Sequence, residues 1–255
     1  LPFLIMTSPL NDGITREFFA SNSNFGLPAE DVHFFVQGTL PCMTEQGKLI
    51  LESRAKVATA PDGNGGIYPA LLESGVLGKL SEAGVESLHV FSVDNALVKP
   101  ADPVFMGFCR SRSADCGNVV CWKRDAGEKV GVVALREGKP CIVEYSEISD
   151  EDRLRTDANG KLAFGAGNIC NHYFSLDFIR DEVLGNQQNL YHIARKKIPA
   201  ADGDGATVKP ESNNGIKLET FIFDCFPQSK TMAILGVPRE EYFDPVKTKP
   251  GSPRD

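Results

Sequence analysis

Short apolar runs alternate with helix-like patterns in the first half of the chain. Residues 3–7, 32–36 and 87–93 are apolar stretches of strand length, and we expect each to form a buried β-strand. Between them, residues 15–22 and 68–83 carry apolar side chains three and four positions apart, which predicts helices. An alternation of strands and helices favours an α/β fold with a largely parallel sheet.

The pattern changes after residue 130, where strands predominate. Two apolar runs flank Glu137-Gly138-Lys139, which predicts a β-hairpin over residues 130–145. The polar segment 200–214 indicates a loop or hairpin tip. We expect one domain over residues 1–240 and a flexible tail, rich in Pro, Lys and Gly, over residues 241–255. The remaining predictions are strands at 162–174, 218–226 and 232–236 and helices at 176–184 and 190–197.

Charge and cysteine content narrow the class of protein. The 255 residues include 34 acidic and 27 basic side chains, giving a net charge of −7, which disfavours nucleic acid as a partner. No apolar run is long enough to span a membrane, so we expect no membrane partner. The seven cysteines are scattered without metal-binding spacing. Reduced thiols in a cytoplasmic protein are therefore expected.

Two runs in the first half could carry ligand chemistry. Gly63, Gly65 and Gly66 precede a predicted helix, where a ligand can approach the backbone closely; an ordinary Asp-Gly turn would give the same pattern. Asp94 follows an apolar strand, at the edge where α/β sheets often place acids that bind Mg²⁺. A carboxylate that only caps the following helix is the alternative.

Three later runs also offer polar groups beside small or aromatic residues. Glu144 and Glu147 could hold sugar hydroxyls or act as an acid–base pair, or could be solvated charges at a strand end. Asn168 lies in a glycine-rich run that permits tight ligand contact, although a glycine bulge beside a core His172 would look alike. Lys217 precedes alternating phenylalanines and suits a phosphate, or is an edge-strand lysine. No histidine lies in a nucleophile motif, which argues against a hydrolase triad.

The order of these runs is more specific than any one of them. Six follow one another: FFVQGTLPCM (34–43), APDGNGGIY (60–68), FSVDNALVKPADPVF (91–105), EYSEI (144–148), GNICNHYF (167–174) and NGIKLETFIFD (214–224). From Leu1 to about Lys247 the chain closely resembles the eukaryotic UDP-N-acetylhexosamine (UDP-N-acetylglucosamine) pyrophosphorylases. The resemblance implies a Rossmann-like, glycosyltransferase-A-like nucleotidyltransferase domain with a mixed central sheet and additional β elements.

The resemblance also implies the reaction, in which UTP and N-acetylglucosamine 1-phosphate give UDP-N-acetylglucosamine and pyrophosphate with Mg²⁺ in the cytosol. On the nucleotide side, Gln37 and Gly63 match uracil contacts and Asp94 matches the acid at the Mg²⁺ and phosphates. Lys217 matches a phosphate-binding lysine, and Lys247 a further lysine near the UTP phosphates. Because the attacking phosphate is already ionised, cations and positioning rather than a general base are expected to provide most of the catalysis.

On the sugar side, the resemblance assigns six residues to the N-acetylhexosamine 1-phosphate. Asn64 and Asn168 match contacts to the amino sugar, and Glu144 and Tyr145 match the sugar-binding pair. Phe221 and Phe223 match the pocket wall near the N-acetyl group.

Two features leave alternatives open. Full-length family members carry a glycine-rich loop, roughly Gly-Gly-x-Gly-Thr-Arg, before the strand with which this chain begins, so we expect the chain to be the central part of the enzyme. A non-catalytic fragment that binds sugar nucleotides is therefore one alternative. A UDP-glucose or broad-specificity UDP-sugar pyrophosphorylase is the other, although the GNICNH and EYSEI runs favour an N-acetylated sugar.

Overall fold

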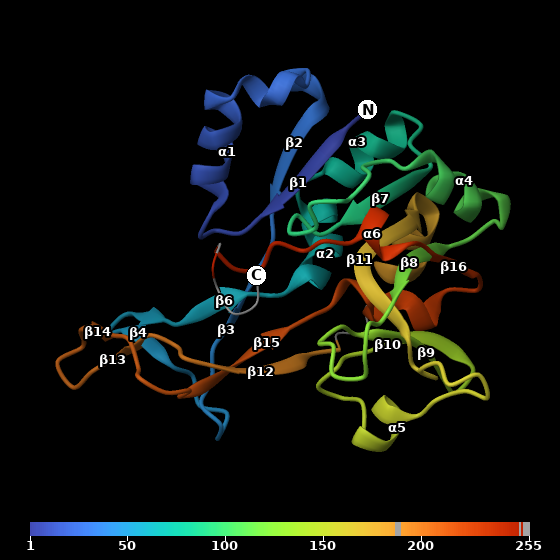
Figure 1. Ribbon diagram of the computed structural model, residues 1–255. Coiled ribbons are helices and arrows are strands. Elements are labelled where there is room, and N and C mark those ends of the chain that lie inside the picture. The colour runs from blue at the N-terminus through green and yellow to red at the C-terminus, as the bar shows by residue number, and fades with distance from the viewer. Residues whose placement is uncertain (187–189, 250, 252–255) are drawn as a thin grey trace. The chain divides into compact units, whose positions relative to one another are not determined.

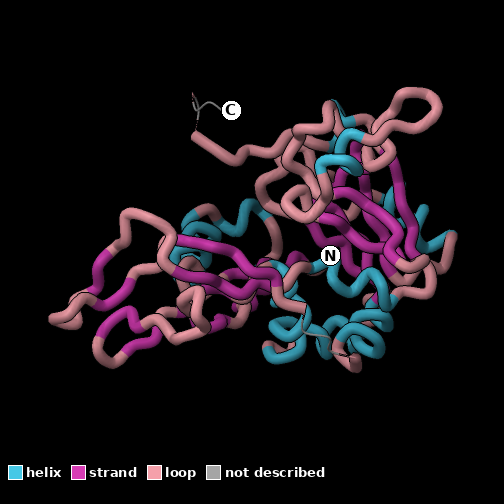
Figure 2. Tube along the Cα trace, turned by 90° about the horizontal axis from the view of Figure 1, so that it is seen from below, coloured by secondary structure: helices cyan, strands magenta, loops and turns pink. Residues whose placement is uncertain are grey.

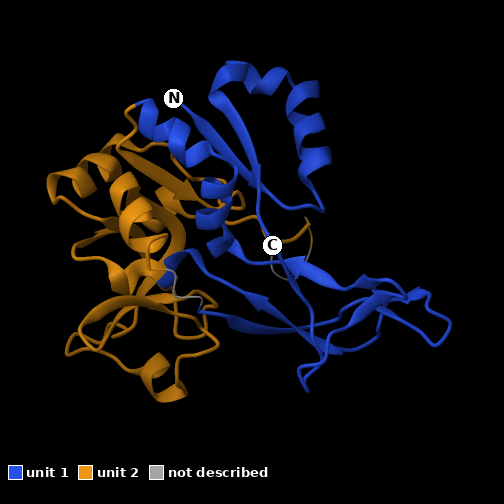
Figure 3. Ribbon diagram, turned by 180° about the vertical axis from the view of Figure 1, so that it is seen from behind, with its two compact units in different colours: residues 1–83, 187–224 blue, residues 84–186, 225–255 orange. Residues whose placement is uncertain are grey.

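The structure, a computed structural model, describes residues 1–186, 190–249 and 251 (Figure 1). The chain folds into two compact units (Figure 3). Unit 1 contains residues 1–83 and 187–224, and unit 2 contains residues 84–186 and 225–255. The predicted boundary at residue 240 stays a prediction, and residues 250 and 252–255 of the predicted tail lie outside the described residues.

Unit 1 begins with two parallel strands, as predicted. Strand β1 (Phe3–Thr7) pairs with β2 (Val32–Val36), and Phe3 lies opposite Val32. Helix α1 (Asp12–Ser21) connects them, and the Thr7 hydroxyl donates to Asp12 Oδ1 at 2.6 Å where the helix begins. Two short turns, η1 (Ser23–Gly26) and η2 (Ala29–Asp31), complete the crossover. The carboxyl end of β2 therefore leads directly into Gln37.

Short antiparallel pairs form the rest of the sheet structure of unit 1. They enclose a small apolar cluster that includes Cys42, Ile50 and Ile198. The hairpin β13–β14 confirms the tip predicted within residues 200–214. The pairs are β3 (Thr39–Pro41) with β6 (Thr59–Pro61), β4 (Leu51–Ser53) with β5 (Lys56–Val57), β12 (His192–Lys196) with β15 (Gly215–Glu219), and β13 (Ala200–Ala201) with β14 (Thr207–Val208).

The helix predicted over residues 190–197 is wrong, because β12 occupies this segment. The apolar side chains at helical spacing do not form a buried face, and Ile193 is 60% exposed. The backbone groups of β12 instead pair with β15, where Ala194 lies opposite Lys217. A partner strand distant in the sequence thus overrides the local pattern.

The single helix predicted over residues 68–83 is two helices. The turn η3 (Asn64–Gly66) is followed by α2 (Ile67–Glu73) and then by α3 (Val76–Glu82). Gly75 lies between the two helices. Gly75 has a φ of +73°, a left-handed conformation that terminates a helix and that glycine adopts without strain.

Unit 2 is built on a mixed sheet in which the strand order is β10-β9-β11-β8-β16, with β7 also paired to β11. Figure 2 shows the strands of the chain in magenta and the helices in cyan. Among the described ladders of this sheet, β8–β16 is parallel and the others are antiparallel. The expectation of a largely parallel sheet is therefore wrong, whereas the mixed sheet implied by the resemblance is confirmed. The strands are β7 (Ser87–Phe91), β8 (Cys116–Trp122), β9 (Val132–Arg136), β10 (Lys139–Val143), β11 (Ala166–Ser175) and β16 (Met232–Gly236).

One physical reason for the antiparallel pairing is the tight turn between β9 and β10. Glu137 and Gly138 both have positive φ, 53° and 77°, as a two-residue hairpin turn requires. A turn this short joins only antiparallel strands. The hairpin prediction is confirmed, while the strands predicted at 87–93 and 162–174 are shorter: β7 ends at Phe91 and β11 begins at Ala166.

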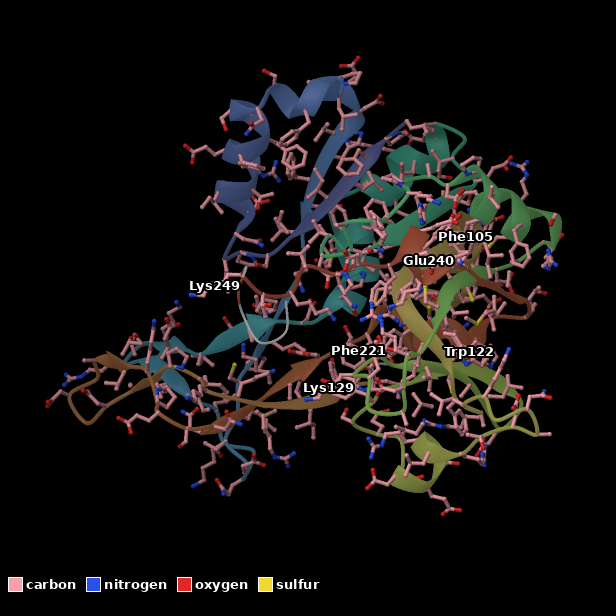
Figure 4. The ribbon with its side chains drawn as sticks, viewed as in Figure 1. Phe105, Trp122, Lys129, Phe221, Glu240 and Lys249 are labelled. Atoms are coloured by element: carbon pink, nitrogen blue, oxygen red, sulfur yellow. The ribbon has the colours of Figure 1, made fainter. Side chains whose placement is uncertain are left out.

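Helix α4 (Pro103–Ser111) supplies much of the core of unit 2. Asp102 caps it by accepting a hydrogen bond from the Val104 amide at 3.0 Å. Phe105 is fully buried in a cluster with side chains of β8 and β11, whereas Trp122 ends β8 half-exposed (Figure 4). Burying a phenylalanine contributes about 2–3 kcal/mol. The other helices are α5 (Asp150–Leu154), α6 (Arg239–Tyr242) and the π-helix η4 (Phe178–Val183), which lies within the predicted helix 176–184.

The strand predicted over residues 218–226 is wrong beyond Glu219, where β15 ends. A 3₁₀ helix, η5 (Ile222–Gln228), follows. Asp224 Oδ2 accepts a hydrogen bond from the Phe221 amide at 2.8 Å, and the Tyr68 hydroxyl donates to the Ile222 carbonyl at 2.5 Å. These side chains satisfy backbone groups that a strand would pair with a neighbour.

All seven cysteines are free thiols, as predicted. Within residues 1–186, 190–249 and 251, no helix is both long and apolar enough to cross a membrane.

Candidate functional site

In unit 1, the Gln37 side chain is fixed against the glycine-rich turn. Its Nε2 donates to Asp62 Oδ1 at 2.8 Å and to the Gly63 carbonyl at 2.9 Å. Burial raises the pKa of Asp62, while the hydrogen bond from Gln37 opposes this shift. Because both bonds use the amide nitrogen, the Gln37 carbonyl oxygen is the atom suited to accept a hydrogen bond from a ligand.

The glycines of this turn are required by its packing against Thr220. Gly63 has a φ of +91°, and a Cβ there would overlap the Thr220 carbonyl. The Gly65 amide donates to that carbonyl at 2.9 Å, and the Thr220 amide donates to the Asp62 carbonyl at 2.7 Å. A Cβ on Gly66 would overlap the Asp62 carboxylate. These contacts position the turn, and direct contact of Gly63 with a ligand stays a prediction.

Asn64 links the same turn to the aromatic residues predicted for the pocket wall. Its side-chain oxygen accepts a hydrogen bond from the Ile222 amide at 2.9 Å. Phe221 and Phe223 flank Ile222, and their rings lie 5.1 Å apart. The structure therefore brings together three of the predicted sugar-side residues within unit 1.

His192 extends this aromatic cluster. Its ring stacks on Phe221 with centroids 4.1 Å apart and an angle of 26° between the rings. Its Nε2 lies 2.9 Å from Asp224 Oδ1, and the other carboxylate oxygen holds the Phe221 amide. Asp224 thus fixes both members of the stack.

Lys217 lies on β15 as a half-buried lysine. Burial raises the pKa of the Cys42 thiol, and the positive charge of Lys217 acts against this shift. In the described part of the chain, no carboxylate forms an ion pair with Lys217. Its charge is available to an anion, as a phosphate-binding role requires.

In unit 2, Asp94 and Lys247 are brought together from distant parts of the sequence. Asp94 Oδ1 accepts a hydrogen bond from the Ser92 hydroxyl at 2.6 Å, and Oδ2 lies 4.0 Å from Lys247 Nζ. The Val246 amide donates to the Asp94 carbonyl at 2.8 Å. Lys247 lies in the tail predicted over residues 241–255, and the contacts of Val246 and Lys247 join this segment to Asp94.

Glu144 and Tyr145 follow directly after β10. The Glu144 carbonyl accepts hydrogen bonds from the Glu147 and Ile148 amides at 2.9 and 3.2 Å, which turns the chain. Tyr145 is 46% exposed. A Cβ on Gly131 would come within 2.5 Å of Glu144 Oε1, so the glycine gives the carboxylate its place beside β9.

Asn168 lies at a β-bulge in β11. The pairing of β11 with β8 changes register between Asn168 and His172, and Cys170 has a φ of +53°. Asn168 is 6% exposed, and its side-chain oxygen accepts a hydrogen bond from the Cys170 amide at 3.0 Å. A bulge beside the core His172 is therefore present, as in the alternative, but Cys170 rather than a glycine has the positive φ, and Gly167 is paired regularly. The bulge begins at Asn168, the residue predicted to bind the sugar.

Cys170 is close to three other predicted site residues. Burial raises the pKa of its thiol to about 11; the negative charges of Glu144 and Asp94 add to this shift, and Lys247 opposes it. The Cys170 carbonyl also accepts a hydrogen bond from the Ser92 amide at 3.1 Å. The Asn168 amide also donates to the carbonyl of Gly131, the glycine that lies against Glu144, at 2.8 Å. With the Asp94–Lys247 pair, these contacts gather Asp94, Glu144 and Lys247 around the bulge that carries Asn168.

In unit 2, Asp94 is a carboxylate that could hold Mg²⁺. Within the described residues, no group of three or more His, Cys, Asp or Glu side chains could hold a metal ion. Mg²⁺ keeps several waters and is usually bound by one or two carboxylates plus substrate phosphates. Asp94 offers one such carboxylate, oriented by Ser92.

Several residues that organise these sites have no role in the sequence analysis. Asp62 and Cys170 lie inside the quoted APDGNGGIY and GNICNHYF runs, so proximity to motif residues was the available signal. Ser92 likewise lies beside Asp94. Thr220 lies inside the NGIKLETFIFD run, so the same signal was available for it. His192 lies outside all six runs and acts through contacts with Phe221 and Asp224, for which one sequence offers no signal.

Comparisons with known proteins agree with the resemblance. Residues 1–250 match the family described as UTP–glucose-1-phosphate uridylyltransferase. A UDP-N-acetylhexosamine pyrophosphorylase-like protein 1 from Xenopus tropicalis is 47% identical over 256 residues, covering 100% of this chain and 50% of the relative. The UDP-N-acetylglucosamine pyrophosphorylase of Saccharomyces cerevisiae is 41% identical, with 100% and 54% covered. The chain spans about half the length of the curated relatives it matches.

Solved structures show the same likeness. The UDP-N-acetylglucosamine pyrophosphorylase of Trypanosoma brucei is 36% identical, with a TM-score of 0.85 over 98% of this chain and 50% of that one. A UDP-glucose pyrophosphorylase of Leishmania major, at 20% identity and a TM-score of 0.76 over 97% and 53%, shares the fold. This chain therefore belongs to the UTP–glucose-1-phosphate uridylyltransferase family and has the α/β nucleotidyltransferase-like fold of the UDP-sugar pyrophosphorylases.

Proposed function

We propose that the full-length protein joins UTP and N-acetylglucosamine 1-phosphate to give UDP-N-acetylglucosamine and pyrophosphate. The observation that carries this proposal is the gathering of Asp94, Glu144 and Lys247 around the bulge at Asn168 and Cys170. The names of relatives that are 41–47% identical support the same reaction.

Unit 1 is proposed to bind the nucleotide. The carbonyl oxygen of Gln37 suits the N3–H group of uracil, because the amide nitrogen is already held by Asp62 and Gly63. Lys217 provides a positive charge for a phosphate. Asn64 holds the segment that carries Phe221 and Phe223, whose rings suit the methyl group of an N-acetyl substituent.

Unit 2 is proposed to bind the sugar phosphate. The Glu144 carboxylate accepts hydrogen bonds from sugar hydroxyls, and the exposed Tyr145 offers its ring and hydroxyl. Asn168 uses its oxygen to hold the Cys170 amide, so its amide nitrogen is the group suited to donate to the ligand.

The reaction needs charge neutralisation more than proton transfer. An oxygen of the sugar 1-phosphate forms a bond to the α-phosphorus of UTP, the bond from that phosphorus to the bridging oxygen breaks, and pyrophosphate leaves with the electron pair. The attacking oxygen is already ionised, so no side chain has to remove a proton. Lys217 and Lys247 stabilise negative charge on the phosphates.

A magnesium ion (Mg²⁺) is proposed to bind between Asp94 and the phosphates. It would supply further positive charge, and Ser92 would keep the Asp94 carboxylate oriented for it. A cytoplasmic location is proposed as well, which the seven free cysteines support.

The test is pyrophosphate release by the full-length protein with UTP, Mg²⁺ and one of three sugar phosphates. We expect N-acetylglucosamine 1-phosphate to give the highest kcat/KM, above N-acetylgalactosamine 1-phosphate and glucose 1-phosphate. A strong preference for glucose 1-phosphate would show a UDP-glucose pyrophosphorylase instead. No release with any sugar, together with tight binding of UDP-N-acetylglucosamine, would show a binding protein without this activity.

A further inference from the structure

Asn95, next to Asp94, is a buried polar residue for which the proposed reaction has no use. It is 3% exposed. Its Nδ2 donates to the Tyr242 carbonyl at 2.7 Å, and its Oδ1 accepts hydrogen bonds from the Asp244 amide at 3.0 Å and the Leu97 amide at 3.3 Å. The side chain therefore connects the loop after β7 to the segment after α6.

The backbones of the same two segments are also joined. The Ala96 amide donates to the Asp244 carbonyl at 3.1 Å, and the Val246 amide donates to the Asp94 carbonyl at 2.8 Å. Asn95 and Pro245 face each other across this bridge. Residues 242–247, which we call the C-terminal strap, are thus attached to the loop that carries Asp94.

The strap ends at Lys247, whose ammonium lies 4.0 Å from Asp94 Oδ2. The Lys247 side chain is 61% exposed, and an ion pair this exposed contributes little to holding a chain segment in place. The buried bonds of Asn95 are the stronger constraint, since breaking them leaves the Tyr242 carbonyl and the Asp244 amide without their partner. The bonds of Asn95 and the two backbone bonds, rather than the ion pair, therefore hold the segment that ends at Lys247.

We propose that Asn95 is a positioning residue that holds the C-terminal strap so that Lys247 lies beside Asp94, where its charge meets the phosphates of UTP. This rests on the proposed function for the role of Lys247, but the attachment of the strap does not. Asn95 itself contacts no substrate in this proposal.

The strap has a second attachment, which makes the proposal testable without unfolding unit 2. The Tyr242 hydroxyl donates to Asp102 Oδ2 at 3.2 Å, and Lys99 Nζ lies 3.7 Å from the centre of the Tyr242 ring. Loss of the Asn95 side chain should therefore loosen residues 244–247 while Tyr242 stays in place.

A double-mutant cycle in the full-length protein tests whether Asn95 acts through Lys247. We expect Asn95→Ala and Lys247→Met each to raise the KM for UTP about tenfold, as loss of one charge-assisted contact does, with a smaller effect on the KM for the sugar phosphate. If Asn95 acts through Lys247, the double variant has the KM of Lys247→Met alone. If the two effects multiply, so that the double variant has a KM for UTP about a hundredfold above wild type, the proposal is overturned.

Asp115→Ala is the matched control. Asp115 also holds two backbone amides, of Lys230 and Thr231 at 2.7 and 3.0 Å, but it precedes β8 at the opposite end of the strand from Trp122. We expect this variant to leave the KM for UTP unchanged, alone or combined with Lys247→Met. A tenfold rise in KM from Asp115→Ala would show that any loss of a side chain that holds two backbone amides has this effect, and would overturn the specific role of Asn95.

Hydrogen exchange provides a readout that does not depend on activity. The amides of Ala96, Asp244 and Val246 should exchange at least tenfold faster in Asn95→Ala and at the wild-type rate in Lys247→Met. Unchanged exchange in Asn95→Ala would overturn the attachment of the strap. A wild-type protein that releases no pyrophosphate would instead overturn the proposed function, and the exchange rates would still decide whether Asn95 holds the strap.

Discussion

At the scale of single residues, both carboxylate oxygens of Asp94 are positioned by neighbouring side chains. One carboxylate oxygen is held by the Ser92 hydroxyl at 2.6 Å, and the other faces Lys247 at 4.0 Å. An asparagine in its place could still accept the bond from Ser92, so the shape of the loop would survive. The negative charge would not.

We therefore expect Asp94→Asn to lower kcat by roughly 10²- to 10³-fold, the scale seen when one preorganised electrostatic contact is lost, while the free energy of unfolding changes by less than about 1 kcal/mol. Steady-state kinetics at saturating Mg²⁺ and urea unfolding measure the two effects. Asp150→Asn, which removes an exposed carboxylate paired with Arg153, is the control. Equal turnover of Asp94→Asn and wild type would remove Asp94 from the reaction.

His172 makes the free energy of unfolding depend on pH. It is buried beside Phe174 and Phe226, and among the described residues neither ring nitrogen has a hydrogen-bond partner. Burial, with a smaller contribution from His89, lowers its pKa to about 3, against about 6.5 in an unfolded chain. Between these values the unfolded state binds a proton that the folded state does not.

Above pH 6.5 the ring is neutral in both states, and the full free energy of unfolding is present. As the pH falls from 6.5 towards 3, the unfolded state gains a proton that the folded state does not, and the free energy of unfolding decreases. At pH 4.5 the loss is about 2–3 kcal/mol relative to pH 7.5. We expect His172→Leu, which is similar in volume, to reduce the loss of unfolding free energy between pH 7.5 and 4.5 by that amount. Urea unfolding at the two pH values measures it, with His33→Gln as control. The same pH dependence in His172→Leu and wild type would contradict this account.

At the scale of elements, β11 determines how the polar residues of unit 2 are presented. Its first part pairs with β8 and β9, its last part with β8 and β7, and the register changes between Asn168 and His172. Cys170, with its φ of +53°, lies at this change. A left-handed conformation costs a residue other than glycine about 1–2 kcal/mol, and a bulge of this kind redirects side chains.

At position 170, a glycine variant should therefore be more stable than a valine variant, which is the opposite of the order in a regular strand. We expect Cys170→Gly to stay within about 1 kcal/mol of wild type, and Cys170→Val to lose roughly 2 kcal/mol or more, because a β-branched side chain is strained at positive φ. At Cys141, inside β10, valine should be more stable than glycine. Urea unfolding measures all four variants, and the same order at both positions would show that the bulge carries no strain.

The elements that could be predicted are those fixed by local sequence. Strands β1 and β2 have their predicted bounds, and the β9–β10 hairpin follows from a two-residue turn at Glu137 and Gly138. Strand β12 and helix η5 could not be predicted, because β12 depends on pairing with β15 and η5 on the capping of Phe221 by Asp224. The first determinant is a tertiary contact and the second is a local side-chain-to-backbone bond between residues 221 and 224, and hydrophobic periodicity reports neither.

At the scale of the whole molecule, the chain carries two sets of candidate site residues, one in each unit. Unit 1 brings Gln37 to Gly63 and Asn64 to the phenylalanines, and unit 2 brings Asp94 to Lys247. The residue types alone identify the polar runs but leave each with a purely structural alternative. The order of six runs indicated the family, because spacing along a chain is far more specific than any one motif.

The central proposal is that each of the two sets of residues takes part in binding a UDP-N-acetylhexosamine. Hydrogen exchange of the full-length protein with and without saturating UDP-N-acetylglucosamine tests this most directly. We predict slower exchange at Gly65 and Thr220 in unit 1 and at Asn168 and Cys170 in unit 2, with no change at Lys230. Protection confined to one unit, or equal protection by UDP-glucose at the same concentration, would contradict the account.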